Sequence, residues 1–192
     1  MVLRIRKIAL VGSLALVVVA ALALAGPLTS AASASPCKRF GNEMPNELSH
    51  RHARMAIRCL LNRRRSHHGL NHLRKNSRLK RAAQKHSIYM LSHRCFDHEC
   101  PGEPSVLARL EHVNYIVGGL RRWLYGENIA YGGRSYGTPK WVVRAFMHSP
   151  PHRHNILNPG FREIGVGVTH GIPPKPGAHG STITTDFGMR KR

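Results

Sequence analysis

The chain has 192 residues, and its 30 Lys and Arg against 9 Asp and Glu give a formal net charge of +21 at pH 7. Such an excess predicts an anionic partner, either a cell-surface polymer or a lipid head group. The basic residues are scattered, few aromatic residues lie among them and no known recognition module is present, which argues against a specific nucleic-acid reader. A generally basic proteome is the alternative explanation of the charge.

Residues 1–34 have the pattern of a signal peptide. Three basic residues in the first seven positions precede the apolar run Ile8 to Ala25, and Ala32-Ser33-Ala34 resembles a cleavage site. The run is close to the ~20 residues that cross a membrane, so an uncleaved anchor is the alternative. Both interpretations predict that the rest of the chain is secreted or tethered at the cell surface. Removing those three charges from +21 leaves +18, because the segment contains no Asp or Glu.

Four cysteines in an exported chain predict two disulfide bonds, and three connectivities are open. We favour Cys37–Cys59, which would pin the N-terminal arm to the first helix. The second bond would then be Cys95–Cys100, which closes a small ring around His98. A zinc site is the less favoured alternative, because paired C-x2-C knuckles are absent.

The element pattern predicts helices first and a hairpin late. Residues 35–46 form a polar arm, followed by helices at 47–69, from Ser77 to about residue 90, and at 104–112. In the first helix Arg51, Arg58 and Arg65 lie opposite the apolar face. A fourth helix, capped by Thr138, runs to Pro150.

Strands are expected mainly in the second half of the chain. A turn-rich linker at 118–126 leads to a short strand at 128–131, and alternating patterns at 164–168 and 181–187 predict an antiparallel hairpin. The order of elements predicts an α+β fold in which helices cover an antiparallel sheet.

His98, Glu127 and His152 are the candidate functional residues. Each lies in an expected loop or at a helix end, where functional groups are common. Acids are scarce, with none between Leu48 and Phe96, so a Glu in a Gly-Glu-Asn turn is conspicuous. Two imidazoles and a carboxylate are natural ligands for a divalent cation such as Zn²⁺ or Mg²⁺. Without metal, a Glu beside a His can act as an acid–base pair.

Six motifs, taken in order, resemble the CAP superfamily of cysteine-rich secretory, antigen 5 and pathogenesis-related 1 (SCP-like) proteins, in its short bacterial secreted branch. They are LNRRRSHHGLNHL, RAAQKHSIYM, FDHEC, GENIAYGG, SPPHRHNIL and TTDFG. The resemblance implies a three-layer α-β-α sandwich with a small antiparallel sheet over residues 47–190.

The resemblance also implies a central cleft in which two His and two Glu can hold a divalent ion. His98 and Glu127 match the first His and Glu, and His152 matches the second His. Ser149 stands at the position of the second Glu, which would weaken metal binding. Asn128, next to Glu127, is expected to tie its turn together and line the cleft.

Structural roles are the alternatives for these residues. His152 at a helix C-terminus would bond backbone carbonyls, and Glu127 would pair with an arginine. His86, on an apolar helix face, is expected to be a satisfied core histidine, with the cleft floor as the alternative. Asp186 would be the buried partner of an arginine or a backbone group.

The functional expectation is a non-enzymatic extracellular binding module for a lipid, glycan or cell-wall polymer, with Arg51 to Arg94 attracting an anionic surface. The alternative is a metal-assisted hydrolase of peptide or cell-wall material, with Glu127 or a metal-bound water as base. A purely structural module is the third candidate. No G-x-S-x-G or H-E-x-x-H motif is present, so a standard serine hydrolase or zincin is not expected.

Overall fold

The computed structural model describes residues 34–192, and the expected signal peptide lies outside them apart from Ala34. Within the described part of the chain, no helix is both long enough and apolar enough to cross a membrane.

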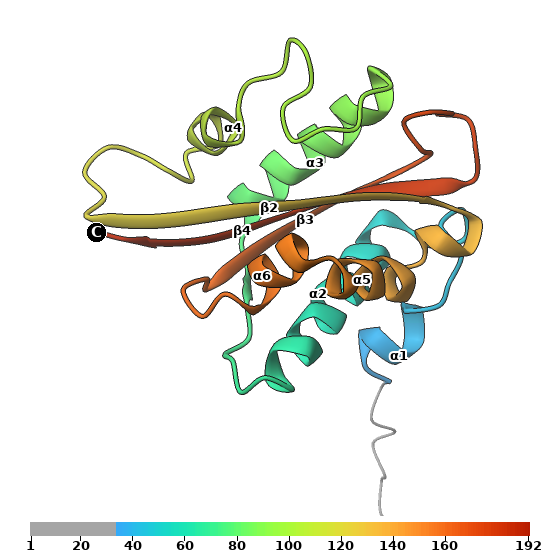
Figure 1. The fold of residues 1–192 in the computed structure, drawn as a ribbon, viewed down its shortest axis with the longest axis horizontal. Coiled ribbons are helices and arrows are strands. Elements are labelled where there is room, and N and C mark those ends of the chain that lie inside the picture. The colour runs from blue at the N-terminus through green and yellow to red at the C-terminus, as the bar shows by residue number, and fades with distance from the viewer. Residues whose placement is uncertain (1–33) are drawn as a thin grey trace, which may run out of the picture. The chain divides into compact units, whose positions relative to one another are not determined.

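A four-stranded sheet separates two layers of helices (Figure 1), which is the sandwich that the resemblance implies. The strands, in the spatial order β1-β3-β4-β2, are β1 (Arg74–Lys75), β3 (Glu163–His170), β4 (Gly180–Lys191) and β2 (Arg122–Gly133). One face is covered by α3 (Ser77–Ser92) and α4 (Val106–His112). The other face is covered by α1 (Pro36–Phe40), α2 (His50–Ser66), α5 (Pro139–His148) and α6 (Pro150–Leu157).

The sheet is mixed, whereas a purely antiparallel sheet was expected. The late hairpin is confirmed, since β3 pairs antiparallel with β4 and Ile164 lies opposite Phe187. The two residues of β1, however, run parallel to β3. The linker expected at 118–126 is wrong from Arg122 onward, because β2 begins there and pairs with the last residues of β4.

The N-terminal arm is folded, not merely polar. Pro36 begins α1, where its fixed φ suits the first helical position and its missing N–H costs no bond. Cys37 and Phe40 are buried there, and a disulfide joins Cys37 to Cys59 with an S–S length of 1.99 Å. The bond ties α1 to α2, as expected for this pairing.

The expected fourth helix is two helices. α5 ends at His148, and a separate helix, α6, begins at Pro150. His152 therefore lies in the first turn of α6, and the expectation of a helix C-terminus is wrong. A proline at the first helical position favours this second start.

Arg65 is fully buried, although the pattern placed it on the solvent face of its helix. Its Nη1 donates hydrogen bonds to the carbonyls of Ile156 at 2.7 Å and Asn158 at 2.9 Å. Arg65 thus satisfies carbonyls at the end of α6 that have no partner within the helix, which fixes α6 against α2.

α3 packs directly on the backbone of β3. A Cβ atom at Gly165 would lie 2.1 Å from the carbonyl carbon of Leu79, and one at Gly167 would lie 2.2 Å from the carbonyl oxygen of Ala83. Alternate residues of the same strand, Ile164 among them, are buried in the core on the other face. Glycine on one face of β3 therefore sets the distance between the α3 layer and the sheet.

We predict that Gly167→Ala lowers the free energy of unfolding by about 1–3 kcal/mol, because the added methyl group must displace the α3 backbone. Chemical denaturation measures the effect. Gly177→Ala is the control, since a Cβ there would have no atom within 4 Å. Equal stability of the two variants would contradict the tight packing of α3 on β3.

Candidate functional site

Glu127 lies near the middle of β2, and its buried carboxylate faces the α3–α4 layer. Arg109 of α4 donates a hydrogen bond from Nη2 to Oε2 at 2.6 Å. His98 Nδ1 donates to the other oxygen, Oε1, at 2.8 Å. The structure thus brings together two of the three candidate residues, and it also supplies the arginine partner of the structural alternative.

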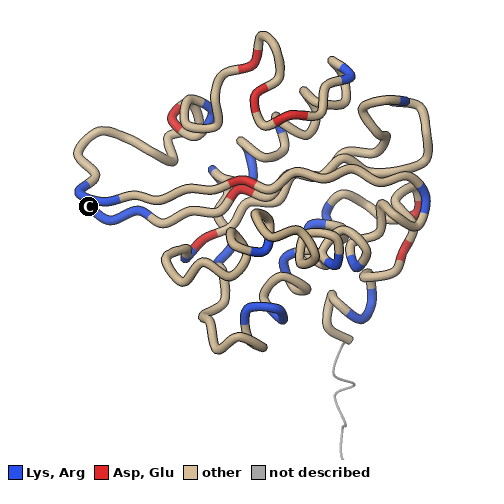
Figure 2. The backbone as a smooth tube through the Cα atoms, viewed as in Figure 1, with Lys and Arg blue, Asp and Glu red and all other residues tan. Residues whose placement is uncertain are grey.

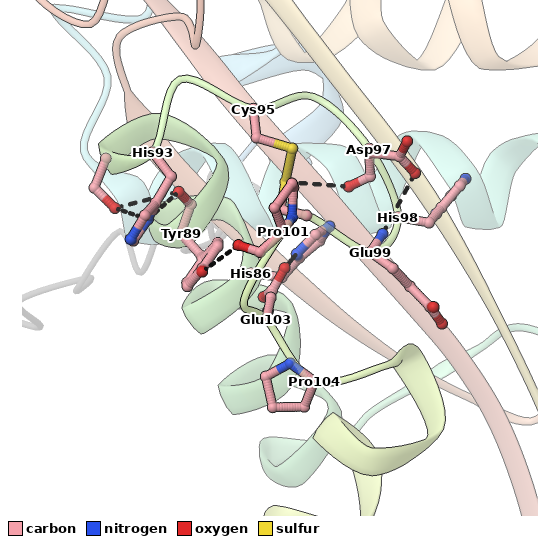
Figure 3. The surroundings of a disulfide bond; sticks show 12 residues. His86, Tyr89, His93, Cys95, Asp97, His98, Glu99, Pro101, Glu103 and Pro104 are labelled. Carbon is pink, nitrogen blue, oxygen red and sulfur yellow. Dashed lines mark hydrogen bonds and ion pairs between the residues drawn. A yellow bond between two sulfur atoms is a disulfide. The ribbon is translucent and has the colours of Figure 1, made fainter.

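His98 is held by a ring of six residues, shown in Figure 3, that the Cys95–Cys100 disulfide closes with an S–S length of 2.06 Å. Arg109 Nη1 donates to the carbonyl of His98 at 2.8 Å, so one arginine positions both the loop and Glu127. The hydrogen bond to Glu127 raises the pKa of His98, although partial burial opposes the change. The side chain remains 46% exposed, so part of the imidazole is accessible to solvent.

A second buried carboxylate, Glu103, accompanies Glu127. His86 Nδ1 donates to Glu103 Oε2 at 2.8 Å (Figure 3). Its Nε2 lies 3.7 Å from Glu127 Oε1. Arg109 lies 3.5 Å from the same Glu103 oxygen. His86 is therefore part of a buried charged network, and its Nε2 has no hydrogen-bond partner among the described residues.

Sequence reasoning missed Arg109 and Glu103. The scarcity of acids was a signal for Glu103, because the chain has only nine Asp and Glu residues. Arg109 gave no such signal, since arginines are abundant and its helix was expected only to direct apolar residues inward.

Asp186 lies directly opposite Glu127 in the β2–β4 register and is fully buried. Burial raises the pKa of Asp186 well above its usual range, and the negative charge of Glu127 raises it further. Burial also acts to raise the pKa of Glu127, but the hydrogen bond from His98 and the charges of His86 and Arg109 lower it overall. Folding therefore favours a proton on Asp186 over one on Glu127. Asp186 was expected to pair with an arginine or a backbone group, but its Oδ1 has no hydrogen-bond partner among the described residues, and the residue opposite it in the sheet is another acid.

We predict that the change in the free energy of unfolding from pH 4 to pH 7 is more favourable in Asp186→Asn than in the wild type. When folding raises the pKa of an acid, the free energy of unfolding decreases as the pH rises from the pKa of the unfolded state, about 3.9 for Asp, toward the pKa of the folded state. Asparagine removes that cost, and Glu127, whose pKa is lowered, contributes in the opposite direction in both proteins. Denaturant unfolding at a series of pH values measures the difference. Parallel pH profiles for wild type and variant would show that Asp186 is not a buried neutral acid.

Asn128 fastens the other face of β2 to α6. Its side-chain amide donates to the carbonyl of His152 at 3.1 Å and accepts from Asn155 Nδ2 at 2.8 Å. Asn155 Nδ2 also donates to the backbone carbonyl of Glu127 at 3.1 Å. Asn128 was expected to stabilise its own turn, and its side chain instead links β2, which carries Glu127, to α6.

His152 packs against Phe146, with 5.0 Å between ring centroids. Burial lowers the pKa of His152, and the positive charge of His98 lowers it further, so the two imidazoles are electrostatically coupled. Ser149 is partly exposed at the junction of α5 and α6, and its side chain makes no capping bond.

The arrangement around Glu127 does not fit a divalent ion as it stands. Each carboxylate oxygen is engaged, one of them by a guanidinium at 2.6 Å. Across residues 34–192, no three His, Cys, Asp or Glu side chains are grouped as metal ligands. Zn²⁺ or Mg²⁺ binding by His98, Glu127 and His152 stays a prediction from the sequence.

Residues 60–171 match the model of the cysteine-rich secretory protein family, CAP. The chain belongs to this family. A curated relative, the uncharacterized protein YkwD of Bacillus subtilis, is 38% identical to this CAP protein over 110 residues. The match spans 56% of this chain and 39% of YkwD, so the chain covers well under half of that relative's length.

Solved structures show the same fold. An outer surface protein from Borrelia burgdorferi superimposes with a TM-score of 0.61 at 20% identity, covering 75% of this chain and 97% of the other. An extracellular protein containing an SCP domain from Bacillus anthracis gives a TM-score of 0.55 at 26% identity, covering 73% of this chain and 43% of the other. The α+β CAP architecture of this chain is thus shared with bacterial proteins.

Proposed function

We propose that this CAP protein is an extracellular, non-enzymatic module that binds an anionic cell-surface polymer or lipid. Two disulfides support an oxidising location outside the cytoplasm. The extracellular protein of Bacillus anthracis and the outer surface protein of Borrelia burgdorferi support the same location.

The observation that carries the proposal is the separation of positive from negative charge. In residues 34–192, Arg109 is the one Lys or Arg with a carboxylate within 4.0 Å. The acids concentrate between α3 and β2 and in the middle of the sheet, whereas α2 carries basic residues alone (Figure 2). A net charge of +18 over residues 35–192, in which Arg109 is the one Lys or Arg paired with a carboxylate, favours association with a polyanion.

Glu127 supports binding over catalysis. Its carboxylate is buried, its oxygens accept hydrogen bonds from His98 and Arg109, and its lowered pKa makes it a weaker base toward a substrate or a water. Glu127 therefore acts in this proposal as part of the scaffold.

We predict that the protein binds vesicles or an insoluble polymer of high negative charge, and that binding falls steeply between 0.1 M and 1 M salt. The screening length falls from ~10 Å to ~3 Å over that range. Co-sedimentation with an uncharged polymer as control measures the effect. Glu127→Gln should keep this affinity, because the charges that bind lie elsewhere. Binding that ignores salt, or that Glu127→Gln abolishes, would contradict the proposal.

A metal-assisted hydrolase is the second candidate, favoured by the half-exposed imidazole of His98 on a buried carboxylate. That function predicts that Glu127→Gln abolishes turnover of peptide or cell-wall substrates in a protein that still folds. Calorimetric titration with Zn²⁺ and Mg²⁺ tests its metal, with His98→Ala/His152→Ala as control. We expect no metal binding, given the Arg109–Glu127 pair. Binding that the double variant loses would favour the hydrolase.

A further inference from the structure

A groove of about 430 Å³ lies at the edge of the sheet, between α2 and α3. It is distinct from the Glu127 network, which lies at the far side of the sheet on β2 and β4. Its lining consists of five basic and three apolar residues: Arg51, Arg54, Arg58, Lys75, Lys80, Met55, Ile164 and Val166.

The positive charge in this groove is not neutralised by the protein. Arg51, Arg54 and Arg58 recur at three- and four-residue intervals on α2 and so share one face of that helix. In the described part of the chain, no carboxylate comes within 4.0 Å of these arginines or of Lys75 and Lys80. Positive charges on the two sides of a groove repel each other, and an anion bound between them offsets this repulsion energy.

The open edge of β3 adds directed hydrogen-bonding groups to the groove. The Ile164 carbonyl accepts the Asn76 N–H at 2.9 Å, and β1 pairs no further along the strand. At Val168 the side-chain amide of Gln84 takes the place of a strand, donating to the carbonyl at 2.8 Å and accepting from the N–H at 3.2 Å. Backbone groups alternate in direction along a strand, so the N–H of Val166 faces the same edge. Val166 lines the groove together with the basic residues, so we expect this N–H to be available to a ligand there.

We propose that the groove binds the phosphate group of an organic phosphate ester, which deepens the proposed function and rests on it. A phosphate offers several acceptor oxygens, which suits arginine forks and a backbone N–H better than a single carboxylate does. The volume far exceeds the ~30 Å³ of a water molecule, and the partly exposed Met55 supplies apolar surface. The phosphate lies among the basic side chains and its organic substituent lies against Met55.

The test is a titration of the ¹⁵N-labelled protein with sn-glycerol 3-phosphate, followed by amide NMR shifts. The Val166 amide should show one of the largest shifts. Arg58→Gln/Lys80→Gln should raise the dissociation constant at least tenfold, and these two side chains make no hydrogen bond in residues 34–192 that the variant would break. The matched control is Arg63→Gln/Arg64→Gln, which removes the same charge from exposed positions of α2 outside the groove and should change the constant less than twofold.

An unmoved Val166 amide, or equal weakening by the two double variants, would overturn the groove as a site and leave only diffuse attraction. Inorganic phosphate binding as tightly as glycerol phosphate would overturn the role of the organic substituent. Competition by phosphatidylglycerol vesicles would identify a lipid head group as the source of the phosphate ester. If the vesicles do not compete, the ester is soluble or part of a polymer.

Polyanion co-sedimentation on the same variants separates the two proposals. Adsorption that both double variants retain, with no shift at Val166, would contradict the groove alone. A specific shift at Val166 without polyanion adsorption would contradict the surface-binding function alone.

Discussion

The buried ion pair between Arg109 and Glu127 fixes the α4 layer and the His98 loop to the middle of the sheet. The Glu127 side chain is 2% exposed and the Arg109 side chain 6%, so neither charge has water as a substitute partner. Removing either partner from such a pair is costly, even where the pair adds little net stability. The remaining bonds of Arg109, to the carbonyls of His98 and Pro104, set the position of the loop. The ion pair with Arg109 therefore limits the chemistry that Glu127 can perform.

The same arrangement explains the surface of the protein. Glu103, Glu127 and Asp186, three of the nine acids, are turned inward into one network, where they meet a single arginine and two histidines. The other described basic residues are left without carboxylate neighbours, and several of them line the groove between α2 and α3. A strongly basic exterior around a self-contained acidic centre suits a protein that adheres to polyanions.

The sequence predicted best where a local pattern was enough. The periodicity of α2 and α3, the β3–β4 hairpin and the order of the motifs all indicated the correct layers. Arg109 was missed because its partners are distant in sequence and nothing local distinguishes it from other arginines. The long β2 was missed because it depends on pairing with the end of β4. The separate start of α6 had a local signal in Pro150, but the contact of Arg65 that holds the helix end is distant in sequence. Asp186 was recognised as buried, but its partner depends on strand register.

The most direct test of this account is a double-mutant cycle of Glu127→Gln and Arg109→Met, measured as free energy of unfolding at pH 7. We expect each single variant to be destabilised and the two side chains to be coupled by about 2–3 kcal/mol. Coupling near zero, with both single variants as stable as wild type, would show that the ion pair does not hold the layers together and that Glu127 is free for another role.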